Sequence, residues 1–279
     1  MILDVMSQNC QIGARDDGRW EGLVRIIREV DPDVLLLQEV DWLTDPDEAE
    51  AAREALAMDL FVAPSRQLNT AVAWKPDRLE RVGTDTRYST TDLHHGYCGI
   101  QFQPLHLTTP WPAPLTVIST HLTPYSTEAA AIEAQLLVAR AYRFGGIGLI
   151  GGDINHPPLG DEEPPWSLVP AHNRAARCLP RENPDDPWFG NPAVGRVFRE
   201  GDMTDVAARL ADRREDPQLR LPTGKAGRLR VDQVHVTPAL VPTITNYRRV
   251  DPGEHADHFG TLTTLDLART DLSAAHPYA

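Results

Sequence analysis

The chain alternates short, continuous hydrophobic runs with stretches in which hydrophobic residues recur every three or four positions. A continuous run bounded by turn residues is typical of a buried strand, and the wider spacing is typical of an amphipathic helix. We therefore predict strands at residues 2–6, 34–37, 69–74, 79–82, 99–105, 115–122, 147–150, 229–236 and 261–267. Helices are predicted at residues 17–30, 45–60, 127–142 and 202–210. Strands that alternate with helices indicate an α/β protein.

The predicted helix at residues 127–142 has a clear start signal and a hydrophobic side. Ser126 or Thr127 is suited to cap its first turn, because the hydroxyl accepts a hydrogen bond from a free backbone N–H group. The helical spacing predicts that the buried side carries Ile132, Leu136, Val138 and Ala139.

Neither composition nor pattern indicates a linker, so residues 1–279 are predicted to form a single domain. A long segment at about residues 156–200 contains nine prolines and little periodicity. Irregular loops of this length are uncommon in compact domains and usually serve a function. We expect this segment to form a wall over the active site, with Trp166, Arg174 and Arg177 as candidate substrate-binding residues.

The run from Leu149 to Asn155 ends a predicted strand with two glycines and then presents Asp153 and Asn155. Side chains two positions apart on an extended chain point to the same side. A carboxylate can activate a water while a carboxamide hydrogen-bonds an oxyanion, so this pair suits phosphoryl chemistry. The alternative is an Asx turn that only closes the strand.

Other polar residues also stand at predicted strand ends, and each has a purely structural alternative. Asn9 could be a turn residue, Glu39 a solvated strand end, and His121 a half-buried strand histidine. Asp232 points inward on a strand, where a carboxylate is costly to bury without a partner.

Near the C-terminus, Asp257 and His258 stand together before the last predicted strand. Such a pair suits metal or phosphate binding. The spacing of His255 and His258 leaves a zinc site as an alternative, although the other candidate ligands are oxygen donors.

Charge and cysteine content narrow the function classes. The formal net charge is −13, and Lys75 and Lys225 are the only lysines, so the chain as a whole repels nucleic acid.

The three cysteines are odd in number and far apart, which predicts buried thiols rather than disulfides or a cysteine zinc site. No signal peptide or membrane-spanning run is apparent, so we expect a soluble cytoplasmic protein without a membrane partner. Oligomeric state is not readable from the sequence.

Taken in order, these stretches resemble the endonuclease/exonuclease/phosphatase superfamily, which has the DNase I-like fold. Six motifs match its pattern along almost the whole chain: Asn9, Gln38-Glu39, Thr120-His121-Leu122, Gly151-Gly152-Asp153-Ile154-Asn155, Arg230-Val231-Asp232 and Asp257-His258. The resemblance implies a four-layer α/β/β/α sandwich with two mainly antiparallel sheets face to face. Strand ends would then gather the six motifs at one edge.

The resemblance also implies a divalent metal, usually Mg²⁺, with Mn²⁺ as the alternative. Glu39 would coordinate the ion with Asn9 beside it, and Asp257 would belong to the metal and water network. The implied activity is metal-dependent hydrolysis of a phosphate ester.

For catalysis, the resemblance implies in-line attack of water on phosphorus. Asp153 would orient or deprotonate the water, and Asn155 would contact the developing oxyanion. His258 would hydrogen-bond the scissile phosphate and pair with Asp232, and His121 would bind the phosphate or act as a general acid.

Three hypotheses about the substrate follow. The acidic composition and the covering segment favour a small or modest-sized phosphate ester. A DNA or RNA nuclease of the same fold is the alternative, and a groove of arginines would support it: Arg174, Arg177, Arg181, Arg196 and Arg199. A non-catalytic binding module is disfavoured, because it predicts loss of site residues and none is missing.

Overall fold

Two six-stranded sheets form the centre of the computed structural model, which describes residues 1–63, 65, 68–86, 96–225 and 228–276. The first sheet has the order β11-β12-β1-β2-β4-β3, and only β1 and β2 are parallel neighbours in it. Its strands are β1 (Ile2–Asn9), β2 (Val34–Gln38), β3 (Asp59–Ala63), β4 (Thr70–Trp74), β11 (Ile244–Val250) and β12 (Gly260–Asp266).

The second sheet has the order β5-β6-β7-β8-β10-β9, and β7 and β8 are its parallel neighbours. Its strands are β5 (Leu79–Asp85), β6 (Tyr97–Pro104), β7 (Leu115–His121), β8 (Gly148–Asp153), β9 (Thr204–Asp205) and β10 (Asp232–Val236). Each sheet is thus mainly antiparallel and contains one parallel pair.

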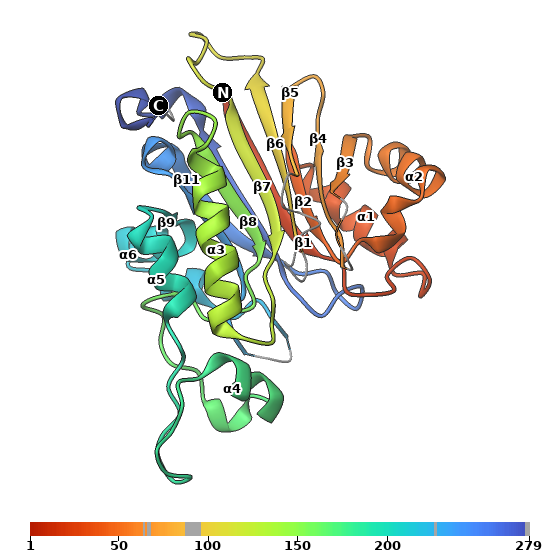
Figure 1. Cartoon of the computed structure of the whole chain (residues 1–279). Coiled ribbons are helices and arrows are strands. Elements are labelled where there is room, and N and C mark those ends of the chain that lie inside the picture. Colours follow the sequence, from red (N-terminus) through yellow and green to blue (C-terminus); the bar gives the residue numbers. More distant parts are fainter. Residues whose placement is uncertain (64, 66–67, 87–95, 226–227, 277–279) are drawn as a thin grey trace.

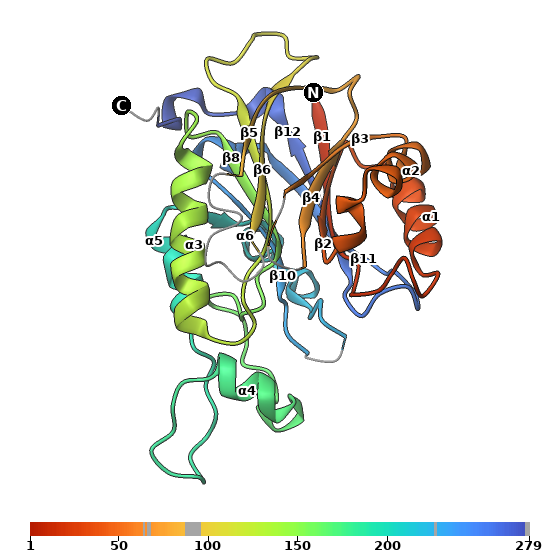
Figure 2. The same ribbon diagram turned by 45° about the vertical axis from the view of Figure 1, so that its right-hand side comes forward.

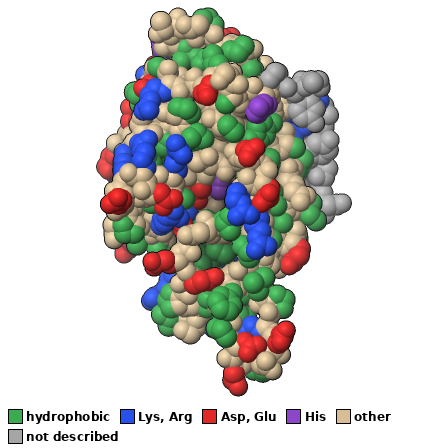
Figure 3. Space-filling model, turned by 90° about the vertical axis from the view of Figure 1, so that its left-hand side faces the viewer, with side chains coloured by type: hydrophobic (Ala, Val, Ile, Leu, Met, Phe, Trp, Pro, Cys, Tyr) green, Lys and Arg blue, Asp and Glu red, His purple; other side chains and the backbone are tan. Residues whose placement is uncertain are grey.

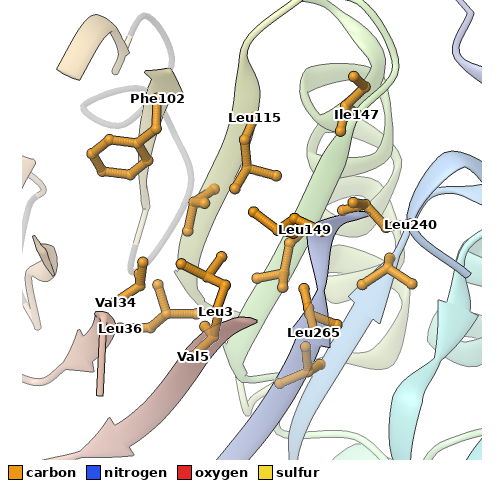
Figure 4. Packing of buried hydrophobic residues seen from close by; sticks show 14 of the residues in the cluster. Leu3, Val5, Val34, Leu36, Phe102, Leu115, Ile147, Leu149, Leu240 and Leu265 are labelled. Atoms are coloured by element: carbon orange, nitrogen blue, oxygen red, sulfur yellow. The ribbon is translucent and has the colours of Figure 1, made fainter. Parts of the chain in front are cut away.

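The two sheets pack face to face around the largest hydrophobic cluster. Figure 4 shows side chains from both sheets meeting between them, with Leu3 and Leu36 from the first sheet and Leu115 and Leu149 from the second. Since the facing residues are fully buried, each contributes about 1.5 to 3 kcal/mol relative to an exposed position.

Helices cover the outer face of each sheet (Figures 1 and 2). The first sheet packs against α1 (Trp20–Val30) and α2 (Pro46–Leu56), and the second against α3 (Thr127–Tyr142) and α5 (Ala193–Glu200). The remaining helices are α4 (Ala171–Arg177) and α6 (Val206–Arg214). Short 3₁₀ helices are η1 (Asp41–Thr44), η2 (Trp166–Leu168), η3 (Pro217–Arg220), η4 (Pro238–Thr243), η5 (Leu267–Arg269) and η6 (Leu272–Ala274). The result is the four-layer α/β/β/α sandwich that the resemblance implied.

Some element predictions were wrong. β3, β9 and β11 were not predicted, and the helix expected at residues 45–60 ends at Leu56 so that β3 can follow. The helix expected at residues 202–210 begins only at Val206, after β9, and runs to Arg214. The Pro-rich segment at residues 156–200 is not uniformly irregular, because it contains η2, α4 and α5. In Figure 1, α4 and the chain around it project below the sandwich, while α5 lies beside α3.

The buried side of α3 also differs from the prediction. Ile132 is 64% exposed and Ala139 is exposed, whereas Glu133 and Arg140 are buried. Glu133 Oε2 accepts a hydrogen bond from the backbone N–H of Thr123 at 2.8 Å, and Arg140 pairs with Asp85. Two charged residues with buried partners therefore lie on the inner side, together with Ala130, Ala134, Leu137 and Ala141. The predicted Ser126 cap is confirmed, since its Oγ accepts from Ala129 N.

The three cysteines, Cys10, Cys98 and Cys178, are buried free thiols, as predicted. Among the described residues, no helix has the length and hydrophobicity needed to cross a bilayer.

His235 is a buried histidine on β10, and its ring packs against α5, one of the helices that cover the second sheet. Its ring stacks on Phe198 with a centroid separation of 4.2 Å, and its Nε2 lies 2.9 Å from Gln233 Oε1. Its Nδ1 is buried and has no hydrogen-bond partner among the described residues. Burial lowers the pKa of His235 to about 4, because a second ring proton would be desolvated.

This histidine should make the fold acid-sensitive. Between the ordinary histidine pKa near 6.5 and the folded value near 4, the unfolded chain binds the extra proton, so stability falls as pH falls. The expected slope is about 1.4 kcal/mol per pH unit for one such site. We expect His235→Gln to reduce the slope of unfolding free energy against pH between pH 6 and 4.5, measured by urea unfolding.

The matched control is Phe198→Leu, which removes the stacked ring but no titrating group. It should lower stability by a similar amount at each pH and keep the slope of the parent protein. An unchanged slope in His235→Gln would contradict the assignment.

Candidate active site

One edge of the sandwich gathers the ends of strands from both sheets. Asn9 ends β1, His121 ends β7 and Asp153 ends β8, while Asp232 begins β10. In the strand register, Asp153 lies directly opposite His121 on one side and Asp232 on the other. Glu39 follows β2, the parallel neighbour of β1. The parallel pairs and the antiparallel β8–β10 pair thereby bring polar side chains from five strands together.

Glu39 and Asp153 are joined by the amide of Asn9. Asn9 Nδ2 donates to Glu39 Oε1 and to Asp153 Oδ2, both at 3.1 Å, and its Oδ1 accepts from Gln11 N at 2.8 Å. Glu39 has a left-handed backbone conformation (φ 62°), so the chain leaves the extended conformation of β2 at this residue. Its Oε2 accepts a hydrogen bond from Ile12 N. The two carboxylates are thus held in fixed positions across the two sheets.

His121 lies against both carboxylates. Its Nε2 is 3.5 Å from Asp153 Oδ2 and 3.9 Å from Glu39 Oε1, and the side chain is buried. The two carboxylates and the imidazole each direct one atom into a space no more than 4.8 Å across.

Asp232 and His258 form a second pair beside Asp153. Asp232 Oδ2 lies 2.9 Å from His258 Nδ1, and Asp153 Oδ2 lies 3.9 Å from the same nitrogen. Since His258 Nδ1 is engaged, its Nε2 is the ring nitrogen left to contact a substrate. The hydroxyl of Thr223 accepts the backbone N–H of Asp232 at 2.9 Å.

The protonation of this pair follows from its surroundings. Burial lowers the pKa of His258, but the carboxylates of Asp232 and Asp153 outweigh burial and raise it to about 10. Burial raises the pKa of Asp153, but His258, His121 and Arg177 together outweigh burial and lower it. At neutral pH, the site therefore holds an Asp153 carboxylate beside a protonated His258.

Asn155 is locked in place by Arg177. Asn155 has a left-handed backbone (φ 62°), and its Nδ2 donates to Leu122 O at 2.9 Å. Arg177 is buried, donates from Nη2 to Asn155 Oδ1 at 2.8 Å, and donates from Nε to the backbone carbonyl of Asn155. Asn173 Oδ1 in turn accepts from Arg177 Nη1.

The residues present fit a divalent cation. The basic groups within 4.0 Å of the Glu39 and Asp153 carboxylates are histidines in the part of the chain that the structure describes. Two converging carboxylates with one imidazole form a donor set that could hold a divalent metal ion. Asn9 directs its amide N–H group, not its oxygen, at these carboxylates.

Three predicted site residues, Asp257, Trp166 and Arg174, lie apart from these groups. Asp257 is exposed and belongs to neither of the two acidic and histidine clusters found among the described residues. His255, the alternative zinc ligand, is partly buried and belongs to neither cluster. Trp166 is buried in a small hydrophobic cluster with Val169. Arg174 donates to Trp166 O and stacks on the Trp188 ring. Their roles remain predictions.

The five arginines proposed for a nucleic-acid groove have different surroundings. Arg177 is engaged with Asn155, and Arg181 stacks on Trp188 as Arg174 does. Arg196 and Arg199 are exposed on α5, and Arg199 pairs with Glu200.

Sequence reasoning missed two supporting contacts. The link between Arg177 and Asn155 joins residues 22 positions apart through a short helix that the sequence did not predict. Thr223 stands in a loop, and nothing in its sequence neighbourhood signals that it supports Asp232. Both contacts depend on tertiary structure.

A sequence profile of the Endonuclease/Exonuclease/phosphatase family matches residues 6–259, a range that includes every strand-end residue described above. Among curated proteins, no sequence matches the chain.

Solved structures with similar folds include proteins that differ in what they act on. TDP2 from D. rerio, complexed with a single-strand DNA product, gives a TM-score of 0.64 at 14% identity, covering 95% of this chain and 99% of that one. The endonuclease domain of TRAS1, a telomere-specific non-LTR retrotransposon, gives 0.61 at 14% identity, covering 96% and 100%. ANGEL2, a 2′,3′-cyclic phosphatase, gives 0.60 at 14% identity, covering 96% of each chain.

Proposed function

Because the chain belongs to the endonuclease/exonuclease/phosphatase family, we propose that it hydrolyses a phosphate ester by metal-dependent, in-line attack of an activated water. The observation that carries the proposal is the cluster at the sandwich edge. There Asp153 lies within 4 Å of His121 and His258 and within hydrogen-bond distance of Asn9. A purely structural site would not require so many buried polar groups to converge at the end of a sheet.

In the proposed reaction, Asp153 orients the attacking water and accepts its proton. Its lowered pKa keeps it a carboxylate at neutral pH. Asn155 follows on the same strand end, and its amide contacts the oxygen on which negative charge develops. Arg177 holds that amide in place.

His258 supplies positive charge to the phosphate on the other side of Asp153. Asp232 engages Nδ1, which fixes the ring and leaves Nε2–H to donate to a phosphoryl oxygen. His121, buried between Glu39 and Asp153, is placed to bind the phosphate or to protonate the leaving oxygen.

Glu39 is the proposed ligand of a divalent ion, Mg²⁺ or Mn²⁺, with Asn9 beside it as the hydrogen-bond donor that positions the carboxylates. Bound there, the ion would neutralise charge that develops on the phosphoryl group. Asp257 would join this network through water, since its side chain is exposed near His258.

We expect Arg177→Lys to lower kcat by about 10-fold to 100-fold with little change in KM, because displaced reacting groups carry costs of that size. A lysine offers one point of attachment and cannot bind both oxygens of Asn155. Steady-state kinetics on a phosphodiester test this expectation.

Arg213→Lys is the control, because Arg213 is exposed on α6 and is none of the residues at the catalytic edge. It should keep the parent kcat. A rise in KM at constant kcat in Arg177→Lys would instead indicate that Arg177 contacts the substrate, as the sequence predicted.

The favoured substrate is a small or modest-sized phosphate ester, given the net charge of −13. A DNA or RNA nuclease is the second candidate, since TDP2 with bound DNA product and the TRAS1 endonuclease share the fold.

Parallel assays separate the two candidates. A chromogenic phosphodiester, a phosphomonoester and plasmid DNA should be incubated with Mg²⁺, Mn²⁺ or EDTA. Metal-dependent cleavage of a small ester alone supports the favoured proposal, whereas metal-dependent nicking of the plasmid supports the nuclease. Activity that persists in EDTA would contradict both.

A further inference from the structure

A pocket of about 900 Å³ lies beside the catalytic edge and is lined largely by the Pro-rich segment. Its volume is at the upper end of the range for small-molecule sites. Figure 3 views the molecule from the side on which α5 and α6 lie. Hydrophobic side chains gather there on the projecting lower part of the molecule. The lining residues come from three segments: 157–165, 217–222 and 228–230, together with Leu179, Phe189, Gly190 and Pro192.

Each of the three segments leads directly into the catalytic edge. Residue 157 comes two positions after Asn155, and residue 230 comes two positions before Asp232. Residue 222 precedes Thr223, whose hydroxyl accepts the Asp232 N–H and whose carbonyl accepts the Phe259 N–H. Gly224 is bridged to His258. The pocket wall and the proposed phosphate site are therefore parts of one continuous structure.

The pocket has no excess charge to attract a second phosphate. Its charged lining residues are three acids and three arginines: Asp161, Glu162, Glu163, Arg220, Arg228 and Arg230. Two of the arginines are already neutralised, because Arg230 is buried between Asp161 and Asp205, and Arg220 pairs with Asp161 and Asp212. A polyanionic chain would find little compensation there.

The remaining lining is mostly hydrophobic, apart from Gln218 and two glycines, and it is rich in proline. It includes seven prolines and four leucines, and Phe189 presents a ring that is 53% exposed. Prolines restrict the backbone, so such a wall loses little conformational entropy when a ligand binds. The exposed ring offers a stacking surface for a flat group.

We propose that this pocket binds the uncharged, bulky apolar or aromatic half of the phosphate ester, which makes the enzyme selective for such esters. The proposal rests on the phosphoesterase function above, because it takes the phosphate to lie at Asp153 and His258. It assigns the Pro-rich segment to substrate selection through Phe189 and Leu179, rather than through the buried Trp166.

Two pairs of probes test the proposal. Hydrolysis is compared for methyl p-nitrophenyl phosphate and 2-naphthylmethyl p-nitrophenyl phosphate, which share one leaving group. Binding is compared by calorimetry for methylphosphonate and 2-naphthylmethylphosphonate with Mg²⁺. We expect kcat/KM to be at least about 10-fold higher for the naphthyl ester than for the methyl ester, since the naphthyl group buries a large apolar surface. For the same reason we expect the naphthyl phosphonate to bind at least about 10-fold more tightly than methylphosphonate.

In Phe189→Ala, the naphthyl-to-methyl ratio of kcat/KM and the corresponding ratio of binding affinities should each fall about 5-fold or more, because stacking on the ring and burial against it are lost. Leu168→Ala is the matched control. Leu168 is an equally exposed apolar residue (56%) on the same segment, but it does not line the pocket. Its ratio should equal that of the parent protein.

The outcomes separate the two proposals. Hydrolysis without a naphthyl preference would overturn the pocket assignment and leave the phosphoesterase function standing. Phe189-dependent preference in binding without hydrolysis of either ester would support the pocket assignment and count against the function. Equal ratios in Phe189→Ala and Leu168→Ala would overturn the pocket assignment.

Discussion

Asp153→Asn is expected to lower turnover about 10³-fold or more while leaving the protein folded, because general-base contributions reach about 10⁴-fold. The amide keeps the size of the carboxylate but cannot accept a proton from water. It also removes the negative charge that Asn9, His121 and His258 converge on. The measurement is kcat on the best phosphodiester at saturating Mg²⁺.

The control for this variant is Asp77→Asn, at an exposed turn position away from the site. Both variants should give the parent circular dichroism spectrum, so that a loss of activity in Asp153→Asn reflects chemistry. Near-normal turnover in folded Asp153→Asn would remove Asp153 from the proposed mechanism.

The sequence predicted the strands that carry the site because their hydrophobic runs are local signals. The run before Glu39 is continuous, the run before Asp153 ends in two glycines, and the run before Asn9 is interrupted by Asp4; they became β2, β8 and β1. β3 was missed because its hydrophobic run, Leu60 to Ala63, directly follows the helical stretch and was partly assigned to that helix. β11 was missed because its hydrophobic residues Ile244, Tyr247 and Val250 recur every third position. A spacing of three positions is closer to that of a helix than to the alternation of a half-buried strand.

The buried side of α3 shows a second limit. Hydrophobicity placed Ile132 inside, but the helix instead buries Glu133 and Arg140. Their burial is explained by partners elsewhere in the chain, the Thr123 backbone and the Asp85 carboxylate, which satisfy the charges. No local pattern could indicate those partners.

The same difference between local patterns and tertiary contacts explains why the site residues were predicted from the sequence and the residues that hold them in place were not. Asp153 and Asn155 could be predicted because Asp153 ends a strand and Asn155 comes two residues later, and strand ends of the two sheets meet at one edge. The restraint of Asn155 by Arg177, by contrast, depends on how a Pro-rich segment folds back onto that edge. A segment without periodicity gives no register from which such a contact could be derived.

Glu39→Gln is expected to raise the metal concentration required for half-maximal activity at least about 100-fold, because even the loss of an outer-shell partner of a metal ligand costs up to about 100-fold in affinity. Glu39 and Asp153 are the two carboxylates that, together with His121, converge within 4.8 Å, so the substitution halves the negative charge available to a cation. The loss should be partly restored at high Mg²⁺, because the negative charge of Asp153 remains beside the site.

Activity should be titrated with Mg²⁺ in the parent, in Glu39→Gln and in Glu29→Gln, whose carboxylate is exposed on α1. Glu29→Gln should follow the parent curve. Calorimetric Mg²⁺ binding adds a readout that does not depend on turnover, and there too Glu39→Gln should bind more weakly. Superimposable titration curves for the parent and Glu39→Gln would exclude Glu39 as a ligand and shift the metal towards Asp153, Asp232 and His258, the other cluster of the same edge.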